Sequence, residues 1–208
     1  VAWVGERING EDGLGAIFPA MANSVMMYDV LGLAESHPQR AIARKSVEKL
    51  LVIKEHEAYC QACVSPIWDT GLACHALLEA GGERTAARVN RGLDWLVPMQ
   101  VLDVRGDWIA RRPHLRAGDW AFQYANPHYP DVDDTAVVAM AMDRVQKESG
   151  GQDFRTPLER AREWIVGMQS ENGAWGAFDA DNEFYYLNNI PLADHGSMLD
   201  PPTEDVTA

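Results

Sequence analysis

Two internal repeats constrain the fold of this chain more than any other feature. In the first, RGLDWLVPMQVLDVRGDW and RAREWIVGMQSENGAWG each place a tryptophan, then a glutamine five residues later, then Gly-x-Trp. The glutamines are Gln100 and Gln169, and a weaker copy without glutamine starts at Trp3. A glutamine amide can bond to the end of a neighbouring helix while an indole packs on its own turn. We therefore expect each unit to fasten outer helices together.

The second repeat aligns the starts of three predicted helices. WDTG begins at Trp68, DDTA at Asp133 and DVTA at Asp205, each two to four residues after a proline. Helical hairpins that recur with a period of roughly 70 residues predict a solenoid or a closed α/α toroid. Because equivalent inner helices of a toroid face one cavity, we expect these three residues around a common mouth.

The hydrophobic pattern supports an all-α class. Apolar residues recur at spacings of three and four in residues 20–31, 72–78, 137–142 and 160–168, and no long alternating strand pattern competes. Loops rich in Gly, Pro, Asp and Asn separate these segments. The chain starts without Met inside one helical pattern and stops at EDVTA where another begins, so we interpret it as an internal fragment.

The charge balance argues against several classes of partner. A net charge of −13 disfavours nucleic acid and electrostatic docking on anionic lipid. No segment approaches the roughly 20 apolar residues of a spanning helix, and no signal peptide opens the chain, so a cytoplasmic protein is expected. Cys60, Cys63 and Cys74 are an odd number of cysteines without a secretory context, so we do not expect a disulfide framework. With His56 and His75 they leave a zinc site as a minor alternative.

The stretch YPDVDDTAVV crowds Asp131, Asp133 and Asp134 into four residues ahead of an apolar run. Three interpretations stay open: a solvated turn with one or two helix caps, an acid catalyst, and a Mg²⁺ site. If all three carboxylates are partly buried, mutual repulsion raises the pKa of one member and keeps it protonated near neutrality. Aromatic faces stabilise cations, so aromatic neighbours favour an acid that protonates an alkene. Six such residues lie in loops or helix starts: Trp68, Trp120, Phe122, Tyr124, Tyr129 and Phe178.

These motifs resemble the squalene-hopene cyclase family, within the wider triterpene cyclases. DVDDTA resembles the family's DxDDTA acid motif, and the Gln to Gly-x-Trp units resemble its QW repeats. SPIWDTGLA, GDWAFQYANPHYPDVDDTA, WIVGMQSENGAWGAFDADN and DPPTEDVTA follow in the family's order and spacing. The resemblance covers nearly all 208 residues, which correspond to about the middle third of a family chain.

The resemblance implies parts of two α-barrel domains, with residues 1–63 ending an inserted barrel and residues 64–208 belonging to the catalytic α/α barrel. It implies an isomerase that protonates a terminal double bond of squalene and cyclises it through carbocations to hopene or hopanol, with no cofactor and no metal. Asp133 would be the proton donor, Asp131 and Asp134 its carboxylate partners, and Asp205 part of the supporting network. Four further residues would line or shape the cavity: Trp68, Phe122, Phe178 and Ile17.

The resemblance also implies a setting for the full-length protein. It would be monotopic on the cytoplasmic side of a bacterial membrane, bound through elements largely outside these residues, with a homodimer as one assembly open to it. Phe178 stands where relatives often carry Tyr. The chain stops before the family's acid-bonding histidine, so we expect the 208 residues alone to be inactive.

Two other functions stay open. A class II diterpene cyclase shares the acid motif but acts on a prenyl diphosphate, which should require Mg²⁺ and a basic clamp that this stretch lacks. A non-catalytic α-toroid binding module would tolerate loss of the Asp133 carboxyl group.

Overall fold

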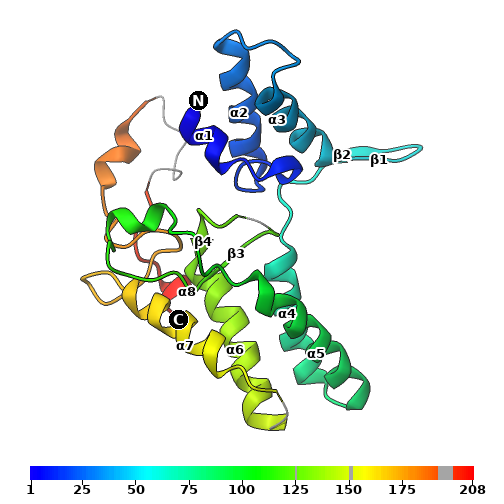
Figure 1. Ribbon diagram of the computed structural model, residues 1–208, viewed down its shortest axis with the longest axis vertical. Helices are drawn as coiled ribbons and strands as arrows, with labels where there is room; N and C mark the ends of the chain where they lie inside the picture. Colours follow the sequence, from blue (N-terminus) through cyan, green and yellow to red (C-terminus); the bar gives the residue numbers. More distant parts are fainter. Residues whose placement is uncertain (125, 150–151, 192–198) are drawn as a thin grey trace. The chain divides into compact units, whose positions relative to one another are not determined.

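The computed structural model describes residues 1–124, 126–149, 152–191 and 199–208. They form two compact units, residues 1–66 with 122–126 and residues 67–121 with 127–208, which we call unit 1 and unit 2. Most described residues are helical and the strands are short, so the all-α prediction is confirmed (Figure 1).

Unit 1 is built on two helices, α2 and α3, that pack side by side (Figure 1). Met21 and Tyr28 of α2 and Ala43 of α3 are buried in its core. Gly13 permits a close approach, because a Cβ atom there would lie 2.6 Å from Ser46 Oγ and its φ of +77° is in the left-handed region. The elements are α1 (Ala2–Arg7), η1 (Gly10–Asp12), α2 (Phe18–Val30), α3 (Pro38–Lys49), β1 (Leu51–Ile53) and β2 (Ala58–Cys60).

Helix α3 was not predicted from the sequence. Its residues PQRAIARKSVEK are mostly polar, and the side chains that it buries, Ala43 and Ser46, are small. Pro38 occupies the first turn, where its fixed φ suits a helix start, and the Ser46 hydroxyl donates back to the Ala43 carbonyl at 2.7 Å. The helix therefore depends on its packing against α2 more than on an apolar stripe.

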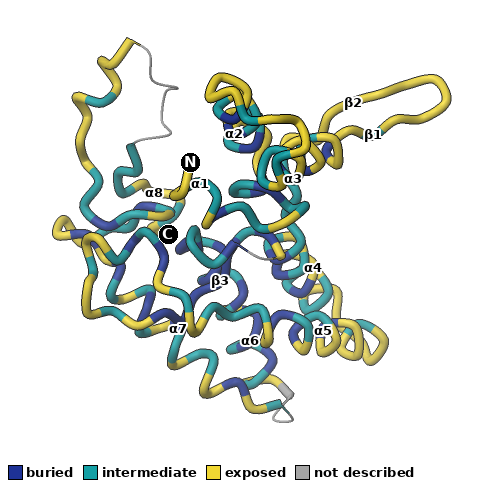
Figure 2. Tube along the Cα trace, turned by 45° about the horizontal axis from the view of Figure 1, so that its top comes forward, coloured by how far each residue is buried: buried dark blue, intermediate teal, exposed yellow. Residues whose placement is uncertain are grey.

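An antiparallel hairpin, β1 with β2, follows α3. Leu51 pairs with Cys60 and Ile53 with Ala58, and the hairpin projects with nearly all of its length exposed (Figure 2). Strands of three residues are too short to produce a recognisable alternating pattern. Cys60 lies exposed on β2, and no three His, Cys, Asp or Glu side chains among the described residues group so as to hold a metal ion.

Unit 2 contains the longer helices and two hydrophobic clusters. Its elements are α4 (Pro66–Ala80, from Ile67 on), α5 (Glu83–Leu96), η2 (Val97–Met99), η3 (Asp107–Ala110), β3 (Trp120–Ala121), β4 (Pro130–Asp131), α6 (Val132–Ser149), α7 (Arg155–Gly167), η4 (Tyr185–Asn189) and α8 (Glu204–Thr207). No described helix of either unit combines the length and apolar character needed to cross a membrane.

Both hydrophobic clusters include residues of α6. The first buries Ile67 of α4, Leu93 of α5 and Val138 of α6. The second contains Val132, the first residue of α6, with Trp108 and Trp164 stacked edge to face at 6.1 Å between ring centroids. Val132 and Val138 are six residues apart, so fewer than two turns of α6 separate the two clusters, and α6 packs into both.

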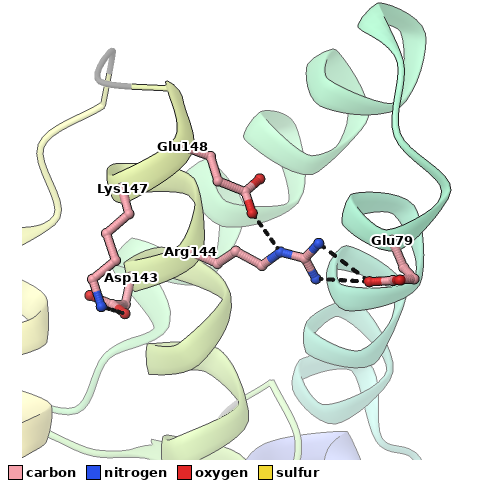
Figure 3. Close-up of polar contacts among 5 residues, drawn as sticks. All are labelled: Glu79, Asp143, Arg144, Lys147 and Glu148. Carbon is pink, nitrogen blue, oxygen red and sulfur yellow. Dashed lines mark hydrogen bonds and ion pairs between the residues drawn. The ribbon is translucent and has the colours of Figure 1, made fainter.

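Ion pairs cover the exposed side of α4 and α6 (Figure 3). Arg144 of α6 contacts Glu79 of α4 at 3.3 Å and Glu148 one turn along at 2.9 Å. Lys147 pairs with Asp143 at 2.7 Å. These groups are exposed or half-buried, so water screens them and each pair contributes little to stability.

The two glutamine repeats behave differently. Gln100 Nε2 donates to the Gly118 carbonyl at 2.7 Å and to the Pro157 carbonyl, in the first turn of α7, at 3.0 Å. The expected bond to a neighbouring helix end is therefore confirmed for Gln100. It is wrong for Gln169, whose Nε2 donates to the Gly173 carbonyl of its own turn at 2.7 Å, because the left-handed Gly173 brings the chain back within reach.

Candidate active site

The three clustered aspartates, Asp131, Asp133 and Asp134, form a carboxylate triad at the first turn of α6. A short pairing of β3 with β4 leads into this turn, with Trp120 opposite Asp131 and Ala121 opposite Pro130. The Val132 N–H donates to the Ala177 carbonyl at 2.8 Å, so α6 begins where the chain is held on both sides. The triad thus sits on an anchored helix start.

Asp131 caps the helix. It precedes the first residue of α6, and its Oδ1 accepts the backbone N–H of Asp134 at 2.7 Å. This is the bond that an N-cap aspartate makes to an otherwise unpaired N–H of the first turn. The helix-cap interpretation therefore applies to Asp131, and the side chains of Asp133 and Asp134 take no part in this cap.

Burial dominates the electrostatics of the triad. Asp131 is 4% exposed and Asp134 1% exposed. Burial raises the pKa of Asp131 well above its usual range, reinforced by a hydrogen bond to Asp134 and by the charges of Asp134 and Asp133. Burial also raises the pKa of Asp134 to about 6. Mutual repulsion, the cause expected from the sequence, is present but smaller than burial, and the proton of this pair is held by Asp131.

Asp133 occupies a different environment from its two neighbours. It is half-buried, and its Oδ1 is enclosed without a hydrogen-bond partner among the described residues. Asp131 and Asp134 bond to each other, and Asp134 Oδ1, like Asp133 Oδ1, has no hydrogen-bond partner among the described residues. Asp133 is therefore the half-buried member of the triad, next to a buried pair whose pKa values are raised.

The starts of two other helices lie near this turn. Gly71 of α4 packs so closely on α6 that an added Cβ would come within 2.9 Å of Val137 Cγ1. One turn further, His75 Nε2 lies 2.9 Å from the Val137 carbonyl. From α8, Val206 packs in the cluster that contains Val132. The structure thus brings together the helix starts that the second repeat aligns.

The remaining predicted site residues lie as follows. Trp68 is half-buried in the first turn of α4. Asp205 is exposed on α8, and a hydrogen bond from Thr203 lowers its pKa. Phe178 is exposed, and its N–H donates to Asp200 Oδ2 at 2.6 Å. In unit 1, Phe122 is half-buried and Ile17 is exposed in a bridge with Cys63.

Sequence reasoning missed Asp69 and Thr135, and it named Trp120 only as one of several aromatic neighbours. Asp69 of α4 is a fourth carboxylate whose charge raises the pKa of Asp134. Thr135 and Trp120 are fully buried and hydrogen-bond to each other beside Asp131. The aligned WDTG and DDTA starts already pointed to Asp69 and Thr135, but only the fold shows their contacts.

Comparison with known proteins assigns the family. Residues 64–208 match the model of the squalene-hopene cyclase C-terminal domain, and residues 1–56 match that of the N-terminal domain. The chain belongs to the squalene-hopene cyclase family. Among curated family members, it is 62% identical over its full length to a probable squalene–hopene cyclase of Sinorhizobium fredii and 60% identical to a squalene–hopene cyclase of Bradyrhizobium diazoefficiens, covering 32% of each. Over 99% of the chain it is 41% identical to the squalene–hopene cyclase of Alicyclobacillus acidocaldarius.

The chain spans about a third of the length of these squalene-hopene cyclases. The N-terminal domain match ends at residue 56, in the turn of the β1–β2 hairpin, and the C-terminal match begins at residue 64, shortly before α4. All members of the carboxylate triad lie within the C-terminal match.

Proposed function

We propose that the protein containing this chain is a squalene-hopene cyclase, an isomerase that protonates a terminal alkene of squalene and cyclises it through carbocations to hopene or hopanol. The observation that carries the proposal is the carboxylate triad, in which a buried pair with raised pKa values adjoins a carboxyl group with an available oxygen. Protonating an alkene requires an acid that keeps its proton in a poorly solvated site. The names of the relatives support the same reaction.

Asp133 is the proposed proton donor, with Asp131 and Asp134 as its partners. Its Oδ1 is enclosed and has no hydrogen-bond partner among the described residues, so no bond within this part of the chain occupies it. The proton moves from the carboxyl group to the alkene, which leaves a carbocation and a carboxylate. Loss of a proton from the last cation gives hopene, and capture of water gives hopanol, so the acid needs one proton from solvent for each turnover.

The residues proposed to contact the hydrocarbon substrate are Trp68 and Phe178 of unit 2 and Phe122 and Ile17 of unit 1. Their side chains offer aromatic faces for developing cations and an aliphatic wall for folding the substrate. Asp205 is proposed to support the acid, because its helix start packs through Val206 beside the first residue of α6.

The domain assignment is also a proposal: residues 1–63 would end the inserted α-barrel and residues 64–208 would form part of the catalytic barrel. The division of the described residues into two units near residue 66 favours this boundary. For the full-length protein we propose monotopic attachment to the cytoplasmic side of a bacterial membrane, which would give a water-insoluble substrate access, and assembly as a homodimer.

The test uses the full-length protein, incubated with squalene in detergent, with products measured by gas chromatography–mass spectrometry. Wild type should form hopene or hopanol, and Asp133→Asn should form neither while keeping the thermal stability of wild type. The matched control is Asp103→Asn, an exposed aspartate outside the triad, which should retain activity. Absence of cyclised product from folded wild type would reject the proposal, and turnover by Asp133→Asn would reject Asp133 as the acid.

A further inference from the structure

Between Gln100 and the carboxylate triad runs a buried segment, residues 118–121, that contacts both. We propose that Trp120 and Thr135 are positioning residues that fasten the triad to the Gln100 turn, which we define as residues 97–101. The inference rests on the proposed function only for its catalytic consequence.

On the side of the Gln100 turn, three bonds hold the segment. Gln100 Nε2 donates to the Gly118 carbonyl at 2.7 Å, and the Val101 N–H donates to the Asp119 carbonyl at 2.9 Å. The Trp120 indole Nε1 donates to the Leu96 carbonyl at 2.7 Å. Leu96 is the last residue of α5 and the residue before η2, so the indole bonds to the junction of these two helices. The segment is therefore fixed relative to α5 and its turn.

On the side of the triad, Thr135 connects the same segment to Asp131. The Trp120 N–H donates to Thr135 Oγ1 at 2.9 Å, and Thr135 Oγ1 donates to the Asp131 carbonyl at 2.7 Å. The alternative acceptor, the Trp120 carbonyl, is more distant at 3.3 Å. A hydroxyl group has one proton, so the shorter contact indicates that Asp131 receives it. Thr135 thus couples β3 to the capping residue of α6.

The hydrogen bonds that join Trp120 and Thr135 to Asp131 are rigid because water is excluded from them. Trp120 and Thr135 are both 0% exposed, and Asp131 is nearly as buried. In such surroundings a lost hydrogen bond leaves a polar group that water cannot reach, so the arrangement resists small displacements. A movement of about 1 Å in a reacting group can reduce catalysis by roughly 100-fold. The position of the triad is consequently sensitive to these two side chains.

Loss of the hydrogen bonds of Thr135 or Trp120 should also change the pKa values of the triad. Water that enters beside Asp131 would reduce the burial that raises its pKa and that of Asp134. The titratable and charged groups that surround the triad, or lie on the elements packed against it, are Asp69 and His75 of α4, Asp133 of α6, Asp119 beside Trp120, and Arg160 of α7, whose charge acts on Asp119.

The test compares Thr135→Val with Thr135→Ser in the full-length protein. Valine keeps the shape but removes the hydroxyl, whereas serine keeps the hydroxyl. For Thr135→Val we expect kcat to fall roughly 10- to 100-fold with KM changed less than about 2-fold, and the alkaline limb of the kcat profile to move roughly 0.5 to 1 pH unit lower. Thr135→Ser should restore the position of that limb. An unmoved limb in Thr135→Val, or the same displacement in Thr135→Ser, would overturn the proposal.

A second pair of variants covers the case in which Thr135→Val does not fold. Trp120→Phe removes the indole N–H that bonds to Leu96, and its control is Trp164→Phe. Trp164 is equally buried, but its Nε1 has no hydrogen-bond partner among the described residues. We expect the alkaline limb to shift in Trp120→Phe alone, and equal shifts in both variants would contradict the inference.

Infrared titration separates this inference from the proposed reaction. The band of protonated, buried carboxyl groups should disappear at lower pH in Thr135→Val than in wild type, whether or not squalene is the substrate. If wild type cyclises nothing yet the band shifts, the proposed function fails and the positioning role stands. If wild type cyclises squalene and the band does not shift, the positioning role fails alone.

Discussion

Asp119 supplies a test of how burial determines protonation in this fold. Its side chain is 0% exposed, Oδ2 accepts the Gly118 N–H at a long 3.4 Å, and Oδ1 has no partner among the described residues. Burial raises the Asp119 pKa from 3.8 to about 7, against the smaller lowering effects of backbone hydrogen bonds and of Arg160. The structure therefore predicts that ionised Asp119 destabilises the fold.

The direction of the pH dependence follows from proton binding. The native state binds the Asp119 proton more tightly than the unfolded chain does. The contribution of Asp119 to the free energy of unfolding is therefore greatest below about pH 4, and it falls as the pH rises from 3.8 to about 7. Each pH unit in that interval corresponds to about 1.4 kcal/mol, so the full effect has a ceiling of about 4 kcal/mol. An uncharged side chain of the same shape at position 119 should not lose stability as the pH rises.

Asp119→Asn provides that side chain. The amide adds an unpaired buried NH₂ group at a cost of about 1 to 3 kcal/mol, and ionisation of Asp119 already costs wild type about 1.6 kcal/mol at pH 5, so the two proteins should be similarly stable there. At pH 8 the avoided ionisation should exceed that cost, and the variant should be more stable than wild type by about 1 to 3 kcal/mol.

Thermal unfolding of the full-length protein at pH 5 and pH 8 measures this change in relative stability. Asp103→Asn is the matched control, because Asp103 is exposed and its variant should unfold near the wild-type temperature at both values. A difference in Tm between Asp119→Asn and wild type that is the same at pH 5 and pH 8 would refute the reasoning.

Two further predictions concern stability alone and are measured by thermal unfolding of the same protein. Gln100→Ala should cost about 1 to 3 kcal/mol, because the Gly118 and Pro157 carbonyls each lose a donor, whereas Gln169→Ala should cost less than about 0.5 kcal/mol because its bond is local and exposed. Equal costs would contradict the different roles of the two repeats. Arg144→Ala should cost about 1 kcal/mol or less, diminishing as salt is added, and a larger or salt-independent loss would mean that its ion pairs are less exposed than the structure indicates.

Much of the helical framework was predictable because hydrophobic periodicity is a local property. Residues 20–31, 72–78, 137–142 and 160–168 correspond closely to parts of α2, α4, α6 and α7. Helix α3 and the β1–β2 hairpin were not found, since α3 buries small side chains and three-residue strands show no period. Helix α4 also begins earlier than its WDTG motif, at Pro66, where proline suits a first turn.

Some features of the candidate site could likewise be predicted from the sequence, and others could not. The crowding of Asp131, Asp133 and Asp134, and the motifs that identify the squalene-hopene cyclase family, are properties of neighbouring residues and were readable from the sequence. The different hydrogen bonds of Gln100 and Gln169 could not be predicted from the sequence, because the two motifs are alike and the segments that pack around them differ.

By itself, the sequence determined the all-α class, the glutamine repeats and the placement of three carboxylates at one helix start. Only the tertiary structure decided that Asp131 caps the helix and holds the proton of the buried pair, that Asp133 keeps an available oxygen, and that Thr135 connects the triad to Trp120. The reason is physical: a pKa and a hydrogen-bond partner depend on the solvent excluded by every segment that packs around a group, and those segments come from distant parts of the chain.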